Sequence, residues 1–294
     1  MCEYKLESFY DKKTSTLSYL VIDEESSDAI LIDPILNYEY SSSTISKESL
    51  FKVISRVVER KLNLRSILET HVHADHLTGA LELKKIFPKT KIAIGRGITE
   101  VQAIFKDVYN AKDWNSDGSQ FDLLLDDGNI LKAGSIEVRV IATPGHTPAC
   151  LSYLIGNRVF TGDALFMPDY GTGRCDFPGG SAKELFHSIK NKLYALPDET
   201  KFHPGHDYQP GGRGLKFEST IGESKSENIQ LKSDTKEDDF INFRTKRDQT
   251  LNSPGLLLPS IQFNANGGEH PFVDEKGSQY FKIPVKYSEF DIKI

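Results

Sequence analysis

The sequence predicts an α/β sandwich, in which two sheets pack face to face and helices lie outside. Short apolar runs of strand length alternate with amphipathic helical stretches over residues 17–95 and again over residues 136–202. Because each half must bury one face of its sheet, the two halves are expected to pack sheet against sheet. The chain has 294 residues, 38% of them hydrophobic, which suits one large domain or one domain with an extension.

The first half is expected to open with a hairpin and a helix. Residues 17–23 and 29–34 are apolar runs typical of buried strands, and Pro34 ends the second. Ser46 is expected to cap a helix that runs to about Leu62, because apolar residues recur there with helical spacing. The residues expected on its apolar face are Leu50, Val53, Ile54, Val57 and Val58.

A βαβ unit and the second half follow. A strand over residues 66–70 leads to a helix over residues 77–86, which must end before Pro88, and the chain returns as a strand over residues 91–95. The second half is expected to contain strands over residues 136–142, 150–154 and 159–160, a helix over residues 181–196, and a short strand near residues 201–202.

The composition changes after Tyr208. A polar, charge-rich stretch over residues 218–251 is expected to be helical. The tail carries two apolar segments, residues 256–259 and 281–284, which are expected to dock on the main domain. The expected division is a main domain over residues 1–208 and a C-terminal extension over residues 209–294.

The charge balance favours a small-molecule substrate. A net charge of -6 and a pI near 5.8 argue against nucleic-acid binding, which needs clustered Lys and Arg. The three cysteines, Cys2, Cys150 and Cys175, are a poor disulfide framework and favour a reducing compartment. Neither a signal peptide nor an apolar run of the ~18 residues that a membrane span needs is found. We therefore expect a cytoplasmic protein that does not bind membranes.

The strongest chemical signal is an HxHxDH cluster, made of His71, His73, Asp75 and His76. It lies between an expected strand and an expected helix. A strand directs residues two apart to the same side, so the first two histidines can point together, while Asp75 and His76 turn back from the first helical turn. A single histidine here would be read as a polar surface residue, but four ligand-type side chains within six positions indicate a metal site.

Three more ligand-type residues each lie beside a glycine: His146 in TPGHT, Asp163 in TGDA and His206 in PGHDY. Glycine lets the backbone turn sharply, so a strand end can direct a short side chain toward a metal. His203, which precedes the last turn, is better interpreted as a structural histidine.

In this order the motifs HxHxDH, GHT, GD and GHD resemble those of the metallo-β-lactamase superfamily, over residues 1–208. The resemblance implies an αββα sandwich with a partly helical C-terminal extension, in which residues 1–208 are the catalytic domain and Asp33 is an early structural aspartate. Residues 162–177 and 205–208 resemble persulfide dioxygenases, which oxidise glutathione persulfide. The MPDYGTGR and QPGGR segments further resemble the β-lactamase-hydrolase-like branch of sulfide-detoxifying proteins.

Two metal sites fit these residues. In a zinc hydrolase of the glyoxalase II type, two Zn(II) ions would lower the pKa of a bound water for attack on a thioester or lactone. The ligands would be His71, His73 and His146 for one zinc and Asp75, His76 and His206 for the other, with Asp163 bridging them.

In a persulfide dioxygenase, the resemblance implies one Fe(II) per chain on His71, His146 and Asp163, with positions left open for substrate and O₂. The other four residues would then orient the ligands. Ligand spacing alone does not choose between the two sites. The expected partners are a glutathione-like thiol persulfide and O₂, with sulfite as product. A third interpretation, a non-catalytic metal-binding thiol sensor, is disfavoured by the intact ligand set, and a homodimer remains an open expectation.

Three residues near the ligands are candidates for substrate binding. Arg174 could hold a carboxylate bidentately or fix its loop, with Asp176 as orienting partner or as the other half of a structural ion pair. Tyr208 could donate a hydrogen bond to substrate or be a half-buried aromatic residue. Cys175 is more readily interpreted as an inert buried thiol than as a redox group.

Overall fold

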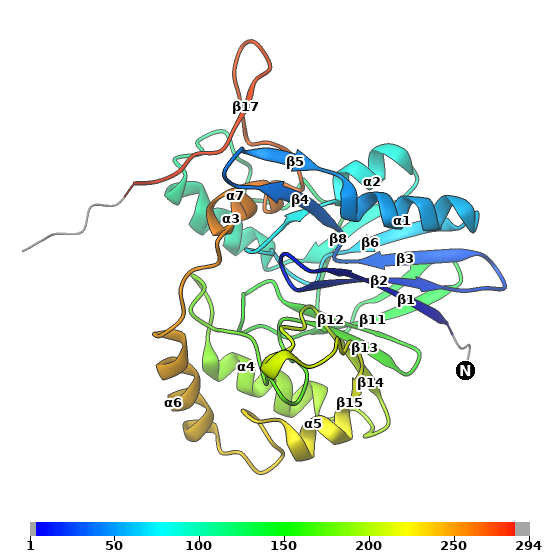
Figure 1. Ribbon diagram of the computed structural model, residues 1–294, viewed down its shortest axis with the longest axis vertical. Coiled ribbons are helices and arrows are strands. Elements are labelled where there is room, and N and C mark those ends of the chain that lie inside the picture. The colour runs from blue at the N-terminus through cyan, green and yellow to red at the C-terminus, as the bar shows by residue number, and fades with distance from the viewer. Residues whose placement is uncertain (1–3, 286–294) are drawn as a thin grey trace, which may run out of the picture.

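The computed structural model describes residues 4–285, and Figure 1 shows two sheets face to face with helices outside. One sheet is covered by α1 (Glu48–Glu59), α2 (Ala80–Ile86) and α3 (Ile98–Val108). The other is covered by α4 (Ala182–Ser188) and α5 (Ile221–Glu227), and α6 (Glu237–Asp248) packs on α4. The predicted α/β sandwich is confirmed.

Both main sheets have six strands. The first has the order β1 (Lys5–Asp11), β2 (Thr16–Ile22), β3 (Asp28–Ile32), β6 (Asn63–Leu68), β8 (Lys91–Gly95) and β9 (Leu123–Leu125). The second has the order β10 (Ile130–Ala133), β11 (Ile136–Ala142), β12 (Leu151–Ile155), β13 (Arg158–Gly162), β14 (Lys201–Pro204) and β15 (Ser219–Thr220). The smaller sheets comprise β5 (Thr44–Ser46), β4 (Ile35–Glu39) and β7 (Leu77–Thr78), and the hairpin of β16 (Phe272–Val273) and β17 (Gln279–Tyr280).

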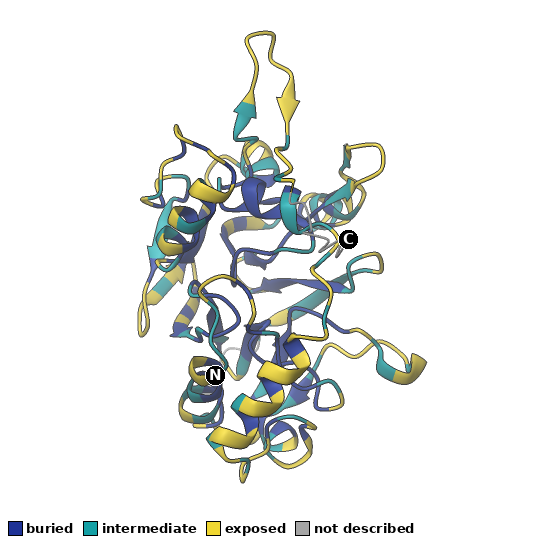
Figure 2. Ribbon diagram, turned by 90° about the vertical axis from the view of Figure 1, so that its left-hand side faces the viewer, coloured by how far each residue is buried: buried dark blue, intermediate teal, exposed yellow. Residues whose placement is uncertain are grey.

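The core has three layers because successive strand residues point to opposite faces of a sheet. On β2, Leu20 and Ile22 pack toward the helices, whereas Tyr19 and Val21 pack between the two sheets. A third apolar cluster lies between the second sheet and its helices. Figure 2 shows these buried layers, with the β16–β17 hairpin projecting from them. None of the described helices is long and apolar enough to cross a membrane.

The segment after residue 208 contacts both halves. β15 pairs with β14 and so extends the second sheet, whereas α7 (Leu257–Asn264) packs beside β7 near the first sheet. Phe281 lies against the apolar cluster of the first half, as the sequence predicts, but Ile283 is exposed. A domain boundary at residue 208 remains a prediction.

The structure corrects two expectations about α1. Ser46 does not cap α1: it ends β5, and Lys47 stands at the cap position without a side-chain hydrogen bond. Val58 is 59% exposed, because the buried stripe of α1 consists of Leu50, Val53 and Val57 and the next residue turns away from it.

Three further expectations are revised. Leu77 is not helical, because it pairs with β4 before α2 begins. The helix expected over residues 181–196 is α4, capped by Ser181, followed by the π-helix Ile189–Leu193. The polar stretch over residues 218–251 is not one helix but β15, α5 and α6, and α3 was not expected at all.

Candidate metal centre

The seven ligand-type residues come from four loops at one edge of the sandwich, where the strands of both sheets end. Residues 71–76 follow β6, His146 lies between β11 and β12, Asp163 follows β13, and His206 follows β14. These strands lie in facing sheets, so their loops converge. The convergence is a consequence of the fold and not of any one segment.

His71, His146 and Asp163 form one compact group, whose ligand atoms all lie within 4.8 Å of one another. Asp163 Oδ2 is 3.7 Å from His146 Nε2 and 4.0 Å from His71 Nε2. All three side chains are buried or nearly so. Two imidazoles and one carboxylate thus face one point.

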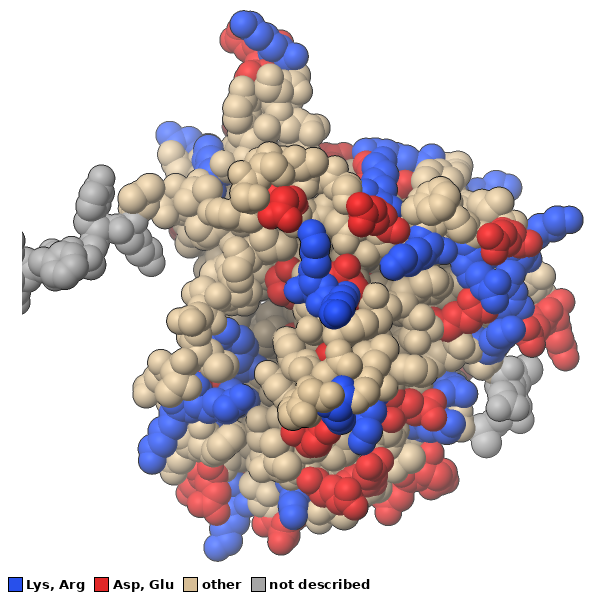
Figure 3. Space-filling view, in the orientation of Figure 1, with Lys and Arg blue, Asp and Glu red and all other residues tan. Residues whose placement is uncertain are grey.

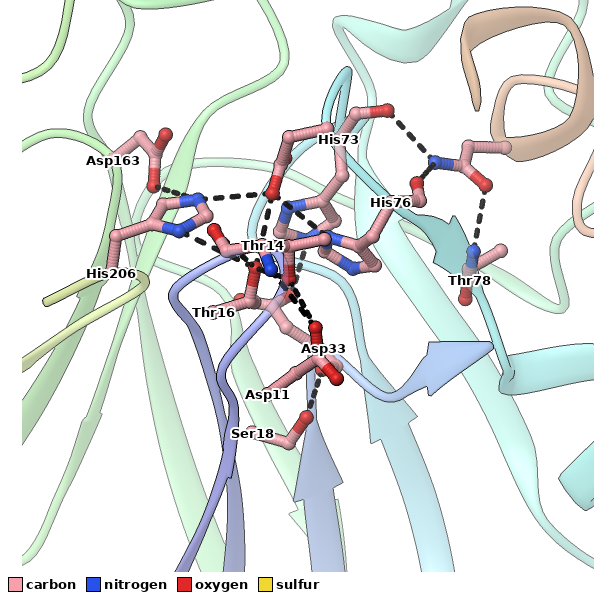
Figure 4. A network of polar contacts seen from close by, with 12 residues as sticks. Asp11, Thr14, Thr16, Ser18, Asp33, His73, His76, Thr78, Asp163 and His206 are labelled. Atoms are coloured by element: carbon pink, nitrogen blue, oxygen red, sulfur yellow. Dashed lines mark hydrogen bonds and ion pairs between the residues drawn. The ribbon is translucent and has the colours of Figure 1, made fainter. Parts of the chain in front are cut away.

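His73, Asp75 and His76 form a second group of this kind, and His206 bridges the two. His206 Nε2 lies 3.6 Å from Asp75 Oδ2 and 3.5 Å from Asp163 Oδ1. His73 is not grouped with His71 and His146. Its Nε2 instead lies 3.0 Å from Asp33 Oδ1 (Figure 4).

The buried polar atoms of these loops fit a metal. Within residues 4–285, no hydrogen bond is made by Nδ1 of His73, by its Nε2 despite the short distance to Asp33, by Nε2 of His76, by Oδ1 of Asp163 or by Nε2 of His206. An unpaired buried polar atom costs about 1–3 kcal/mol, so several in one place need a common partner. A cation coordinated by imidazole and carboxylate satisfies that need.

Hydrogen-bond partners determine which ring nitrogen of His146 and of His71 faces the metal group. His146 Nδ1 is 2.6 Å from the Arg174 carbonyl oxygen, which can only accept, so Nδ1 carries the proton. Thr70 donates its hydroxyl proton to Asp33, so its oxygen accepts from Nδ1 of His71 at 2.9 Å. Both rings therefore present the lone pair of Nε2 to the centre, the tautomer that metal binding requires.

Asp33, which resembles an early structural aspartate, contacts Thr70 directly before the ligand loop. It accepts hydrogen bonds from the backbone N–H and hydroxyl of Thr70 at 2.7 and 2.8 Å. Glu69 shares this buried cluster, 3.7 Å from His73 Nε2, and accepts the hydroxyl proton of Thr78. Sequence reasoning missed Glu69, although a carboxylate between an apolar strand and the first ligand was a visible signal.

Burial and neighbouring charges shift the pKa values of the loop residues. Burial and the other imidazoles hold the pKa values of His71 and His73 well below the usual range, so both are neutral. Burial opposes the ionisation of Asp75, but His206 and His76 outweigh it and hold its pKa well below the usual range. Neutral imidazoles beside an ionised carboxylate are the forms that bind a cation.

The group of His71, His146 and Asp163 opens into a cavity of about 600 Å³. Apolar side chains of its wall include Ile35, Leu36, Phe166, Tyr170, Leu251 and Leu256. The loop between α6 and α7 thus completes the wall. Figure 3 shows the surface hollowed between the two halves, with charged side chains around the opening. Such a volume suits a small organic molecule.

Arg174 and Asp176 form the loop ion pair that the sequence left open as an alternative. Nε and Nη2 of Arg174 donate to the two carboxylate oxygens of Asp176, both at 2.6 Å, and Nη1 donates to the Asn252 carbonyl at 2.7 Å. The fork of Arg174 is thus occupied within the protein. Cys175 is buried between them, and burial raises its pKa, which leaves an unreactive thiol.

Tyr208 lines the cavity and is 42% exposed. Its ring stacks on His206 at 5.3 Å between centroids and lies against Tyr170 at 4.6 Å. No hydrogen bond to its hydroxyl is found within residues 4–285. His203, in contrast, is fully buried with Nδ1 2.8 Å from the Phe217 carbonyl, outside the groups of ligand atoms.

An αββα sandwich with a His/Asp metal site at its loop edge defines a class of metal-dependent proteins. The family model of the Metallo-beta-lactamase superfamily matches residues 12–206. The chain therefore belongs to the metallo-β-lactamase superfamily.

The relatives carry names from two kinds of chemistry. Glyoxylase B2 of Dictyostelium discoideum is 47% identical over 285 residues, covering 96% of this chain and 97% of that protein. The Beta-lactamase hydrolase-like protein of Agrobacterium fabrum is 42% identical over 286 residues, covering 97% of this chain and 65% of that protein. Persulfide dioxygenase ETHE1, mitochondrial, of Mus musculus is 32% identical over 228 residues, covering 77% of this chain and 75% of that protein.

Among solved structures, ETHE1 from Myxococcus xanthus superposes with a TM-score of 0.73 at 30% sequence identity. The match covers 90% of this chain and 100% of that one. The predicted resemblance to persulfide dioxygenases and β-lactamase-hydrolase-like proteins is confirmed.

Proposed function

We propose that this chain is a mononuclear non-haem iron dioxygenase that oxidises glutathione persulfide, or a related thiol persulfide, in sulfide detoxification. The balanced reaction consumes persulfide, O₂ and water, and yields thiol, sulfite and two protons. One observation carries the proposal: His71, His146 and Asp163 form a compact group to which His73 does not belong. Two histidines and one carboxylate are the ligand set of non-haem iron oxygenases, and bound Fe(II) supplies the redox chemistry for O₂.

The relatives named persulfide dioxygenase support the proposal by similarity of sequence and fold. Within the cavity, Phe166 and Tyr170 provide apolar surface beside the metal group, and the hydroxyl of Tyr208, which has no hydrogen-bond partner within residues 4–285, is available to the substrate. The carboxylates of a glutathione-like molecule need a cation. Arg247 lines the cavity and makes no ion pair within the described residues, whereas Arg174 is already paired.

A dinuclear zinc hydrolase is the second candidate, because the relative at 47% identity is named Glyoxylase B2. The unpaired atoms of His206 and Asp163 would suit a second ion. In that enzyme His73 would have to turn from Asp33 to share a metal with His71 and His146.

Metal content and oxygen uptake distinguish the two functions. The dioxygenase binds about one iron per chain and consumes O₂ only when glutathione persulfide is added. Two zincs per chain, rapid hydrolysis of S-lactoylglutathione and no oxygen uptake would reject the proposal in favour of the hydrolase.

Substitution of single ligands tests the same point at the residues. His71→Ala, His146→Ala and Asp163→Ala should abolish iron binding. His73→Ala and His206→Ala should weaken it or the activity by roughly 10- to 100-fold, as for groups that orient ligands. Iron and zinc are measured on freshly purified protein, and equal metal loss from all five variants would indicate a dinuclear site.

A further inference from the structure

The ligand loop, residues 71–76, lacks the backbone hydrogen bonds that hold the rest of the site edge. It follows β6, whose ladder ends at Leu68, and precedes β7. Within the described chain, residues 71–76 take part in no backbone–backbone hydrogen bond. Something else must therefore hold a loop that carries four ligand-type side chains.

Asn264, at the end of α7, makes two hydrogen bonds to this loop and a third to Thr78, two residues after it. Its Nδ2 donates to the carbonyl oxygens of His73 at 2.8 Å and His76 at 2.7 Å. Its Oδ1 accepts from the backbone N–H of Thr78 at 2.8 Å. Figure 4 shows these contacts on His73, His76 and Thr78. Asn264 is 4% exposed, so these hydrogen bonds are shielded from bulk water.

We propose that Asn264 is a positioning residue for the metal centre: it fixes the backbone of the ligand loop from the C-terminal extension, 188 residues from His76 in sequence. One amide holds the carbonyls on both sides of Asp75, and so sets the directions of His73, Asp75 and His76. The extension thereby becomes a part of the metal site, although no side chain of α7 touches the metal group. This inference does not depend on which metal is bound.

Gln262, on the same helix, provides a matched control. It is also a buried amide that donates to two carbonyls, Leu258 and Lys282, and accepts from one backbone N–H, that of Lys282. Gln262 does not contact the ligand loop. Asn264→Leu and Gln262→Met remove equivalent sets of hydrogen bonds with little change of size and no new charge.

The experiment measures two properties of the full chain. In metal-free protein, hydrogen exchange of the Thr78 amide should become faster in Asn264→Leu and stay unchanged in Gln262→Met. By competition with a chromophoric chelator, Zn²⁺ affinity should fall roughly 10- to 100-fold in Asn264→Leu alone. Equal Zn²⁺ affinities in the two variants would overturn the proposal, because loss of stability alone affects both.

Asn264→Asp keeps the test decisive if Asn264→Leu does not fold. It retains the acceptor for Thr78 but loses the two-proton donor that faces His73 and His76. A new carboxylate near the site would by charge alone strengthen cation binding. We expect weaker Zn²⁺ binding, since the carbonyls are released, and unchanged or tighter binding would refute the positioning role.

Discussion

We expect Arg174 to act on the metal site through its loop rather than by binding substrate. Nε and Nη2 of its fork donate to Asp176, Nη1 donates to the Asn252 carbonyl, and its own carbonyl oxygen accepts from the His146 ring. We expect Arg174→Lys to lower metal affinity and thermal stability while KM for persulfide stays near wild type, because lysine cannot make the parallel two-donor pair. Metal titration and steady-state kinetics measure the two effects separately.

Arg96→Lys is the control for this prediction, since Arg96 pairs bidentately with Asp126 on the surface away from the cavity. It should change neither metal affinity nor kinetics. Arg247→Met, in contrast, should raise KM with metal content intact. A raised KM with intact metal in Arg174→Lys would show that Arg174 recognises substrate after all.

His203 makes stability depend on pH. Burial lowers its pKa to about 4 in the folded protein, whereas an unfolded histidine has a pKa of about 6.5. Below pH 6.5 His203 binds a proton in the unfolded chain but not in the folded chain, which favours unfolding. The contribution of His203 to the free energy of unfolding is therefore complete above pH 6.5 and is lost as the pH falls toward 4. The loss should be about 2 kcal/mol between pH 7 and pH 5.

Denaturant unfolding of metal-free protein at these two pH values tests that loss. His203→Gln can still donate to the Phe217 carbonyl, which His203 contacts through Nδ1. Its free energy of unfolding should fall less steeply with acid than that of the wild type. Parallel curves for the two proteins would contradict a buried neutral His203.

At the scale of elements, the turn at Gly145 joins His146 to α4. Gly145 has φ +136°, and a Cβ there would lie 2.3 Å from the backbone nitrogen of Leu185. Helix and turn cannot both keep their places, so Gly145→Ala should cost about 1–3 kcal/mol of stability and reduce metal affinity by displacing His146. Thermal unfolding and metal titration measure the two effects.

Gly128→Ala is the control that separates the cost of backbone strain from that of a steric clash with an added Cβ. Gly128 has φ +76°, and nothing lies within 4 Å of an added Cβ. Gly128→Ala should lose only about 1–2 kcal/mol of stability, the cost of a left-handed backbone conformation, and its metal affinity should not change. The prediction for Gly145 is wrong if the two variants bind metal equally well.

At the scale of the whole molecule, a metal bound by His71, His146 and Asp163 would join the two halves of the sandwich. His71 comes from the first half, whereas His146 and Asp163 come from the second. A ligand that binds only the folded state at 1,000 times its Kd stabilises it by about 4 kcal/mol. Removal of the metal should therefore lower Tm by roughly 10 °C.

Chelation followed by calorimetry tests this contribution. His71→Ala, which should not bind metal, is the control, and its Tm should not respond to the chelator. An equal fall of Tm in both proteins would mean that the chelator acts on something other than this centre.

The sequence determined the fold class and the seven ligand-type residues. β8 and β11 match their predicted bounds because each is a buried strand with turn signals at both ends. The polar region over residues 218–251 did not allow prediction of its helix bounds. α6 is charged on most of its surface and is held by tertiary packing of Phe240 and by hydrogen bonds from Arg244 to the Thr172 carbonyl and Gln230.

Only the tertiary structure decided which side chains act together. HxHxDH contains His71 and His73 two residues apart, yet the fold groups one with Asp163 and directs the other toward Asp33. It likewise brought the Asn252 carbonyl to Arg174 and Asn264 to the ligand loop. Periodicity and motifs report on neighbours along the chain, whereas these contacts join residues on different elements, and their geometry follows from how the layers pack.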